Sequence, residues 1–368
     1  MNNLLTICIP SNRGLKESKR AILMADAFSQ LTDCTVVLSD NSGCRDKQSF
    51  LASVVSPRFK VVQGPVNEGN NWISALEGSS SAYIWFMCDD DFVLPLGAGD
   101  LCDLEKGIHC DDIVGFRPTT FSIKNGGEST RVQRFDIDAS SPADRVLQYL
   151  SANGGNNLTL YSIWKRDVFN NLLSTVVHHP VAVQGRTAGY TDWSQVIGLA
   201  SSGRILAINA FGYGYSNDNW ATSLTIAESN SAIYRRAGVP DSAEPIRGLL
   251  LAADSVATIC GSHSNAAIEA KRDAADVLVS LELERFSAWL LDLVERERPP
   301  SPLTMASARI LGDGLTSFDD RVDRLLAVID LWIPGFGKSY AHYFAKVIDP
   351  VCYSNRGRSA QDAIGRVA

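Results

Sequence analysis

Three consecutive carboxylates, Asp89, Asp90 and Asp91, are the residues of this sequence best suited to chemistry. Five large apolar residues, Tyr83–Met87, and then Cys88 precede them, and Pro95 comes four residues after them. An uninterrupted apolar run bounded by residues that break secondary structure is typical of a strand covered on both faces, as in a parallel sheet. The triplet would then lie at the carboxyl end of that strand, where open α/β sheets bind ligands.

Adjacent carboxylates repel one another unless positive charge lies among them, and their oxygens suit a hard cation such as Mg²⁺ or Mn²⁺. An acidic turn exposed to solvent is the common alternative, because runs of charge are usually solvated. The buried strand that precedes this triplet favours a divalent-metal site. We expect that site to hold a phosphorylated ligand.

Two further polar loops follow predicted strands in the same part of the chain. Residues 4–9 are apolar and end at Pro10, and the strand predicted at 35–38 runs into the turn-forming segment 39–43. A third strand is predicted at 59–62, and segments with helical periodicity separate the strands. This alternation indicates a doubly wound, mainly parallel α/β sheet, so the polar loops would lie along one edge of it.

The absence of two motifs, together with the composition, argues against several classes of protein. No Gly-x-Gly-x-x-Gly follows the first strand and no P-loop motif occurs, which argues against a dinucleotide site and a P-loop NTPase. The net charge of −7 argues against a nucleic-acid partner. No apolar run is long enough for a transmembrane span, no signal-peptide pattern is present, and the eight cysteines lack zinc-site spacing. We therefore expect a cytoplasmic protein with reduced thiols.

The order of four motifs resembles that of family 2 glycosyltransferases. Residues 6–13 (TICIPSNR) are similar to the opening strand and loop of that family, and residues 39–43 (SDNSG) to its second nucleotide loop. Residues 67–77 resemble the helix that leads into its acidic strand, and residues 83–95 fit that strand in the version with an Asp triplet. The resemblance implies a GT-A fold of the nucleotide-diphospho-sugar transferase type and a nucleotide-sugar donor.

Carried over by position, the resemblance assigns donor-binding roles to the first two loops. Pro10, Asn12 and Arg13 would line the nucleotide pocket. Asp40 would hydrogen-bond the base or the ribose, and Asn67 would help to close the base pocket. For Asp40 and Asn67, ordinary turn formation explains the residue types equally well.

The same resemblance divides the triplet between donor and metal. Asp89 and Asp90 would bind the ribose and the sugar-proximal side of the donor. Asp91 would bind the Mg²⁺ or Mn²⁺ that bridges the diphosphate, with Asp89 as a second candidate ligand. Cys88 departs from the small or acidic residue often found before the triplet, so the division among the three aspartates stays open.

Asp192 is a second candidate for chemistry. Apolar residues at helical spacing follow it, so Thr191 and Asp192 would lie in the first turn of a helix. A carboxylate there also stabilises a helix through its dipole, without any catalytic role. In the family, a Glu-Asp motif precedes such a helix, and a strand like residues 203–208 follows it. The resemblance aligns Asp192 with the catalytic base, while Thr191 replaces the usual Glu.

Two segments close to Asp192 have both a functional and a structural interpretation. His178 and His179 could reach a phosphate or the acceptor, or could simply lie exposed in a loop. An aromatic, Gly-rich stretch after the 203–208 strand could stack on an acceptor sugar or form a plain surface loop; its candidate residues are Tyr213, Tyr215, Asn217, Asn219 and Trp220.

We predict a GT-A glycosyltransferase domain over residues 1–220 and a helical module over 221–368, where strand patterns give way to helical periodicity. The expected function is a metal-dependent, inverting glycosyltransferase that moves a sugar from a nucleotide sugar to a hydroxyl of a glycan or lipid-linked glycan, in surface polysaccharide or glycan synthesis. A non-catalytic nucleotide-sugar-binding subunit and a sugar nucleotidyltransferase are the alternatives. Association with the inner face of the membrane would be peripheral, and the helical module would support a homo-oligomer.

Overall fold

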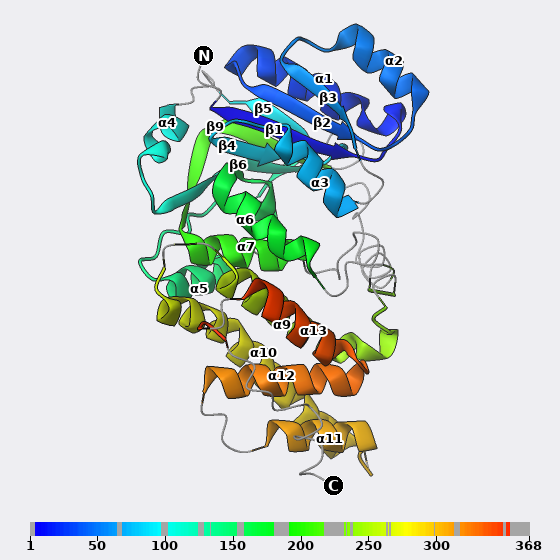
Figure 1. Ribbon diagram of the computed structural model, residues 1–368, viewed down its shortest axis with the longest axis vertical. Coiled ribbons are helices and arrows are strands. Elements are labelled where there is room, and N and C mark those ends of the chain that lie inside the picture. Colours follow the sequence, from blue (N-terminus) through cyan, green and yellow to red (C-terminus); the bar gives the residue numbers. More distant parts are fainter. Residues whose placement is uncertain are drawn as a thin grey trace.

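The computed structural model describes residues 4–64, 68–96, 102–123, 129–132, 134–152, 158–179, 191–216, 232, 234–235, 238–262, 264, 266–297, 299–312, 317–348 and 351–353. These residues form a mixed α/β structure with one twisted sheet and a stack of helices beside it (Figure 1). Helices α1 and α2 lie on the side of the sheet away from the stack, and α3, α6 and α7 lie on the side toward it (Figure 1).

The sheet has nine strands among the described residues, in the order β3-β2-β1-β4-β8-β6-β9-β5, with β7 paired to β6. The strands are β1 (Leu5–Ser11), β2 (Thr35–Asp40), β3 (Phe59–Gln63), β4 (Tyr83–Phe86), β5 (Phe92–Pro95), β6 (Ile113–Ile123), β7 (Ser129–Arg131), β8 (Ile163–Lys165) and β9 (Arg204–Ser216). Strands β1 to β4 are parallel, as predicted, because a helix connects each one to the next.

The other half of the sheet is not the parallel arrangement that was expected. Strand β8 is antiparallel to both of its neighbours, and β5 is antiparallel to β9, although β6 and β9 are parallel. Residues 83–95 form two strands instead of one, with the Asp triplet in the turn between them. That turn is too short for a crossover, so β5 pairs with a strand from a distant part of the chain.

The helices are α1 (Leu15–Thr32), α2 (Arg45–Val54), α3 (Glu68–Glu77), α4 (Cys102–Ile108), α5 (Pro142–Ala152), α6 (Arg166–Val177), α7 (Thr191–Ser202), α9 (Arg247–Cys260), α10 (Ile268–Arg296), α11 (Pro302–Leu311), α12 (Phe318–Trp332) and α13 (Phe336–Val347), with 3-10 turns η1 (Leu158–Tyr161) and η3 (Asp241–Ile246). None of the described helices combines the length and the apolar character that crossing a bilayer requires.

Local signals explain several helix starts. The Ser141 hydroxyl caps α5, accepting a hydrogen bond from the Asp144 amide at 3.0 Å. In the Pro-rich segment 299–302, Ser301 caps α11 and Pro302 occupies its first turn.

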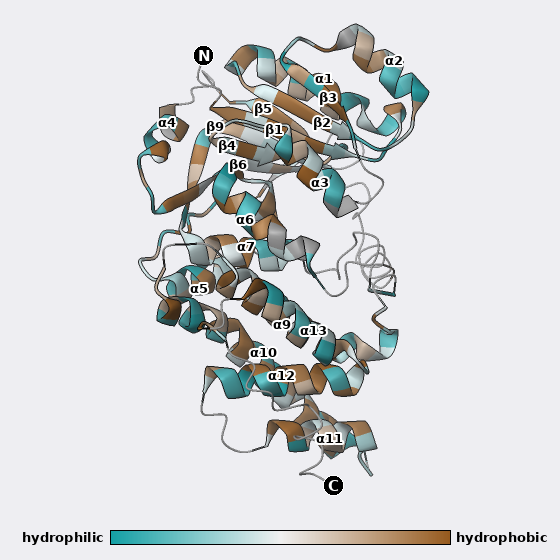
Figure 2. Cartoon of the chain, in the orientation of Figure 1, coloured by the Kyte–Doolittle hydropathy of each residue, from teal (hydrophilic) through white to brown (hydrophobic). Residues whose placement is uncertain are grey.

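Two hydrophobic clusters lie on the two faces of the sheet. One packs β1, β2 and β4 against α1. The other begins at Ile84 and Phe86 of β4, passes through Val196 of α7 and continues to Val256 of α9 and Leu325 of α12. Figure 2 shows the matching hydropathy. The central strands are largely hydrophobic, and hydrophobic and hydrophilic residues alternate along the helices. The division at residue 220 stays a prediction, but this second cluster extends across it.

Candidate active site

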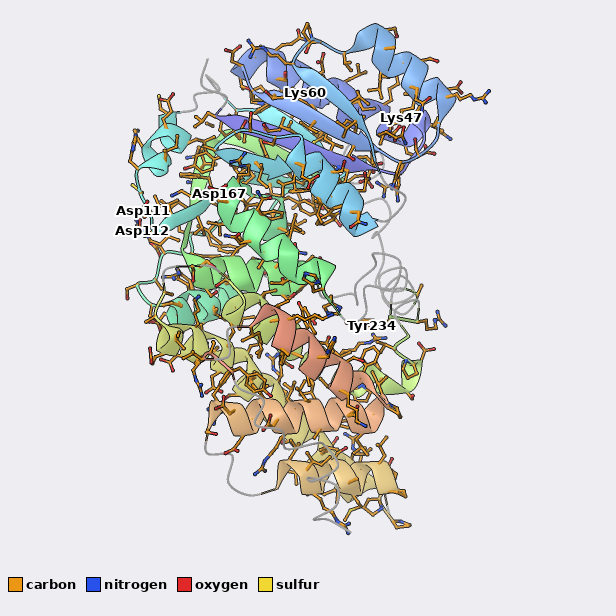
Figure 3. The ribbon with its side chains drawn as sticks, viewed as in Figure 1. Lys47, Lys60, Asp111, Asp112, Asp167 and Tyr234 are labelled. Carbon is orange, nitrogen blue, oxygen red and sulfur yellow. The ribbon has the colours of Figure 1, made fainter. Side chains whose placement is uncertain are left out.

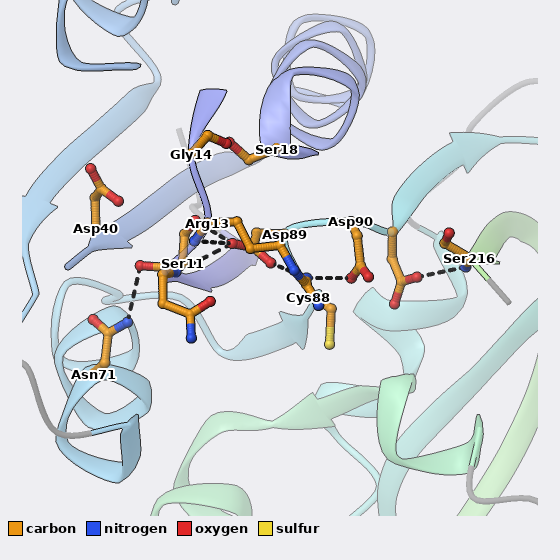
Figure 4. Close-up of polar contacts among 12 residues, drawn as sticks. Ser11, Arg13, Gly14, Ser18, Asp40, Asn71, Cys88, Asp89, Asp90 and Ser216 are labelled. Atoms are coloured by element: carbon orange, nitrogen blue, oxygen red, sulfur yellow. Dashed lines mark hydrogen bonds and ion pairs between the residues drawn. The ribbon is translucent and has the colours of Figure 1, made fainter. Parts of the chain in front are cut away.

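The turn after β4 lies beside the loops that follow β1 and β2, at the carboxyl ends of these parallel strands. Ser11 at the end of β1 is in register with Asp40 at the end of β2. The Ser11 hydroxyl donates a hydrogen bond of 2.5 Å to Asp89, which ties the β1 loop to the triplet (Figure 4). Residues far apart in the sequence therefore form one polar cluster at this edge.

Asp89 holds the backbone of the β1 loop. One of its oxygens accepts the amides of Asn12 and Arg13 at 3.2 and 3.1 Å as well as the Ser11 hydroxyl. The other accepts the Arg13 guanidinium, and the side chain is only 4% exposed. This geometry gives Asp89 the task of shaping the loop. Its predicted contacts with the donor and the metal stay predictions.

Arg13 supplies positive charge to the triplet. Its Nη1 contacts Asp89 and also lies 2.8 Å from Asp90 Oδ1 (Figure 4). Burial lowers the pKa of Arg13, but the two carboxylates outweigh that effect and raise it above its ordinary value. Asp90 is also partly buried, and burial raises its pKa in spite of the attraction to Arg13. One cation of the protein thus compensates part of the charge of the triplet.

Asp91 is the most deeply buried member, at 1% exposure. Its two oxygens accept hydrogen bonds from the Tyr213 hydroxyl at 2.5 Å and the Ser216 amide at 2.7 Å, both from β9. Burial, followed by the nearby charge of Asp90, raises the pKa of Asp91 to about 7 despite these two donors. The carboxyl group is therefore poised between its neutral and charged forms near neutral pH.

Ligand atoms of Cys88, Asp90 and Asp91 lie within 4.8 Å of one another, which is close enough to share a cation. The carboxylates are hard ligands that suit Mg²⁺ or Mn²⁺, and a cation would offset the burial and the Asp90 charge that raise the pKa of Asp91. Burial raises the pKa of the Cys88 thiol well above its usual range, so the sulfur is protonated and contributes less to a hard ion. The donor set fits the predicted metal, with Asp90 beside Asp91.

A buried ion pair that the sequence reasoning missed supports the same loops. Lys47 of α2 is fully buried, and its Nζ donates to Asp40 Oδ1 at 2.9 Å, to Ser11 Oγ at 2.5 Å and to the Arg13 carbonyl at 3.0 Å. Asp40 Oδ1 also accepts the Ser42 amide at 3.2 Å. Helical spacing in the sequence could have indicated that Lys47 is buried, because Lys47 lies one helical turn before Leu51, which is also buried.

Asn71 of α3 joins the ends of β1 and β2. Its Oδ1 accepts the Ser39 hydroxyl at 2.6 Å, and its Nδ2 donates to the Ser11 carbonyl at 3.4 Å (Figure 4). Gly64 lies against it so closely that a Cβ there would be 2.0 Å from Asn71 Oδ1. Asn67, the predicted base-pocket residue, lies outside the described residues. Asn71, in the same predicted motif, lies at this edge and contacts both strand ends.

Pro10 and Asn12 have less contact with the rest of the cluster. Pro10 is half-buried near the end of β1, opposite Ser39, and the Asn12 side chain is exposed. Both lie at the edge where a donor would bind, and their roles stay predictions.

Asp192 and the triplet both lie within electrostatic reach of one side chain, Tyr215 of β9. Asp192 is half-buried in the first turn of α7, where its Oδ1 accepts the Trp193 amide at 3.0 Å. Burial raises the pKa of the Tyr215 hydroxyl, and the nearby charges of Asp91 and Asp192 raise it further. The carboxylates of Asp91 and Asp192 therefore both act on the Tyr215 hydroxyl. The side chain of Thr191 lies outside the described residues.

Three tyrosines pack together beside the triplet. Tyr161 stacks on Tyr213 with ring centroids 5.0 Å apart and an interplanar angle of 8°, and Tyr215 lies 5.9 Å from Tyr161. The Cys88 thiol donates to the Tyr161 hydroxyl at 3.5 Å. Asn217, Asn219 and Trp220 of the predicted stacking loop lie outside the described residues.

One of the two histidines differs from both interpretations of the sequence. His178 is exposed, whereas His179 is buried, with Nε2 2.6 Å from Asp254 Oδ1 in α9. His179 is therefore a packing contact between α6 and α9, and the expectation of an exposed pair is wrong for it.

No protein-family model and no curated protein sequence matches this chain. Among solved structures, it is similar to the fragment 1–349 of S. aureus TarS in complex with UDP, at 13% identity and a TM-score of 0.45, over 99% of this chain and 92% of the other. The same fragment in complex with UDP-GlcNAc aligns at 13% identity and a TM-score of 0.43 over 99% and 92%. A longer TarS structure aligns at 13% and 0.45 over 98% and 55%. This weak likeness assigns neither a family nor an activity.

Replacing Lys47 with Met should destabilise the protein by about 3 kcal/mol, because it leaves the Asp40 carboxylate buried without its cation. Chemical denaturation would measure the loss. The double variant Lys47→Met/Asp40→Asn should recover part of it, and Lys60→Met, at an exposed lysine of β3 (Figure 3), should cost little. An equal loss in the single and double variants would mean that Lys47 contributes packing instead of charge pairing.

The raised pKa of Asp91 predicts a pH-dependent effect of Asp91→Asn in metal-free buffer. Between the unfolded pKa near 4 and the folded pKa of about 7, the folded state holds the extra proton, so wild-type stability falls as the pH rises. The variant stays neutral and should gain on the order of 2–4 kcal/mol over wild type between pH 5 and pH 8.

Urea denaturation in EDTA at the two pH values would measure this difference. Asp111→Asn, at an exposed aspartate just before β6 (Figure 3), is the control and should show none. If the stability difference between Asp91→Asn and wild type were the same at both pH values, Asp91 would have an ordinary pKa.

Proposed function

We propose that the protein is a metal-dependent glycosyltransferase with a GT-A-type nucleotide-binding sheet, which transfers a sugar from a nucleotide sugar to an acceptor hydroxyl with inversion. The observation that carries the proposal is the placement of Asp90 and Asp91 beside the β1 and β2 loops, with Asp91 and Asp192 both acting on the Tyr215 hydroxyl. Two carboxylates at a ligand-binding sheet edge and a third on a separate helix suit a diphosphate leaving group and a general base.

The donor would lie across the ends of β1 and β2. Asp40 is fixed there by Lys47, and Asn71 holds the two strand ends together. The surface on which the donor would lie is therefore rigid before a ligand binds. Pro10 and Asn12 would contact the nucleotide from the β1 side. The sequence resemblance to family 2 glycosyltransferases supports the nucleotide sugar as the donor.

Asp90 and Asp91 would hold Mg²⁺ or Mn²⁺. When bound, the cation would supply Lewis-acid neutralisation of the diphosphate as it leaves. Arg13, next to Asp90, adds a fixed positive charge to the same side.

Asp192 would take the proton from the acceptor hydroxyl as its oxygen attacks the anomeric carbon. A single displacement with one base inverts the configuration at that carbon. Tyr161 and Tyr215 pack against each other beside the triplet, where an acceptor sugar would stack on them.

The geometry is less favourable to a sugar nucleotidyltransferase. Such an enzyme needs backbone amides of the first loop to bind a triphosphate, but the amides of Asn12 and Arg13 already donate to Asp89. A non-catalytic nucleotide-sugar-binding subunit differs from the enzyme in turnover alone, so the experiments below include donor hydrolysis.

Nucleotide binding should be metal-dependent. One of UDP, GDP, dTDP or CDP should raise the melting temperature by several degrees with Mn²⁺ and much less without it. Asp91→Ala should lose the metal-dependent part, because it removes a ligand of the cation, whereas the exposed control Asp111→Ala should keep it. Equal shifts with and without Mn²⁺, or no shift with any nucleotide, would contradict the proposal.

Asp192→Asn should reduce transfer at least about 100-fold, because an amide cannot accept the acceptor proton. The Mn²⁺-dependent thermal shift should persist in this variant, since the donor site is intact. Product formation and nucleotide release from the sugar nucleotide are the measurements. Asp167→Asn is the matched control, an exposed aspartate in the first turn of α6 (Figure 3). Full activity in Asp192→Asn would remove the proposed base, and absence of any turnover in wild type would favour the binding subunit.

A further inference from the structure

Helix α9 is buried along nearly its whole length. Every residue from Leu249 to Cys260 is buried, including the polar residues Asp254, Ser255 and Thr258. Buried polar groups are tolerated only when they have hydrogen-bond partners. Their partners therefore show which parts of the molecule α9 is fixed to.

Thr258 connects α9 to the first turn of α7. Its Oγ1 donates to the backbone carbonyl of Ser194 at 2.8 Å and to the Ser255 carbonyl of its own helix at 3.2 Å. Ser194 is two residues after Asp192. One turn further along α7, a Cβ at Gly198 would lie 2.8 Å from Thr258 Cβ, so the backbone of α7 approaches α9 closely here. A shift of α9 would therefore displace the turn that carries Asp192.

One turn earlier on α9, Asp254 fixes the helix to α6 and α13. Its Oδ1 accepts the Tyr340 hydroxyl at 2.7 Å and pairs with His179 Nε2 at 2.6 Å. Tyr343 of α13 donates to the Thr175 carbonyl of α6 at 2.9 Å. Buried hydrogen bonds thus join α9 and α13 of the C-terminal stack to the end of α6 and to the start of α7.

We propose that Thr258 is a positioning residue for the reaction: through Ser194 it fixes the first turn of α7, and with it the Asp192 carboxylate, relative to the acidic triplet. This rests on the proposed function, in which Asp192 is the general base. A base works only at the correct distance and angle from its proton, and a displacement of about 1 Å can cost about 100-fold in rate. The helices beyond residue 220 then belong to the catalytic unit.

Three substitutions in the full chain test this. Thr258→Val removes the hydroxyl and keeps the branched shape, and Thr258→Ser keeps the hydroxyl. Ser255→Ala is the matched control, because Ser255 is equally buried on α9 and its hydroxyl donates to Leu251 of the same helix at 2.8 Å. Each is assayed with Mn²⁺ and the nucleotide sugar whose nucleotide gives the largest thermal shift, and by hydrogen–deuterium exchange of α7.

Thr258→Val should lower kcat about tenfold at unchanged KM for the donor, and amide exchange in the first turns of α7 should become faster. Thr258→Ser should restore both values toward wild type. Ser255→Ala should change neither, even if it lowers the melting temperature as much.

Equal kcat in Thr258→Val and Ser255→Ala, or faster exchange in α7 without loss of kcat, would overturn the proposal. A failure of the proposed function is distinguishable from these outcomes. In that case the unsubstituted protein would turn over no nucleotide sugar in the same assay, and the role of Thr258 would be refuted with it.

Discussion

Compensation of negative charge at the end of a buried strand is the constraint on which this structure depends. Asp89, Asp90 and Asp91 lie in the turn that follows β4, and Asp40 ends the strand two places away in the sheet. Arg13 contacts two members of the triplet, and fully buried Lys47 pairs with Asp40. Because unpaired buried charge is very unfavourable, these cations and the loops that carry them must adopt nearly one arrangement.

The three neighbouring aspartates consequently have three different environments. Asp89 is hydrogen-bonded to the β1 loop, Asp90 is paired with Arg13, and Asp91 lies where burial brings its pKa to about 7. A metal ion would complete the compensation at Asp90 and Asp91. The acidic turn is thus a structural element as well as the proposed ligand set, and its hydrogen bonds and ion pairs hold the carboxylates in place.

The helices of the C-terminal part share the core of the sheet. Buried residues from β4 through α7 to α9 and α12 form one continuous cluster, and Thr258 of α9 hydrogen-bonds the turn that carries Asp192. Close packing transmits displacement because interiors have little free space. The position of Asp192 relative to the triplet therefore depends on residues far beyond it in the sequence.

The sequence by itself determined the local features: the strands β1 to β4, the helices between them, the acidic triplet at a strand end, and Asp192 in a first helical turn. These follow from hydrophobic periodicity and capping, which act over a few residues. Only the tertiary structure decided that β5 pairs with β9, that Lys47 is buried against Asp40, and that Asp91 is bonded to Tyr213, 122 positions away. Side chains of the same type look alike in a sequence, and their charge state and role are set by partners that only folding brings into contact.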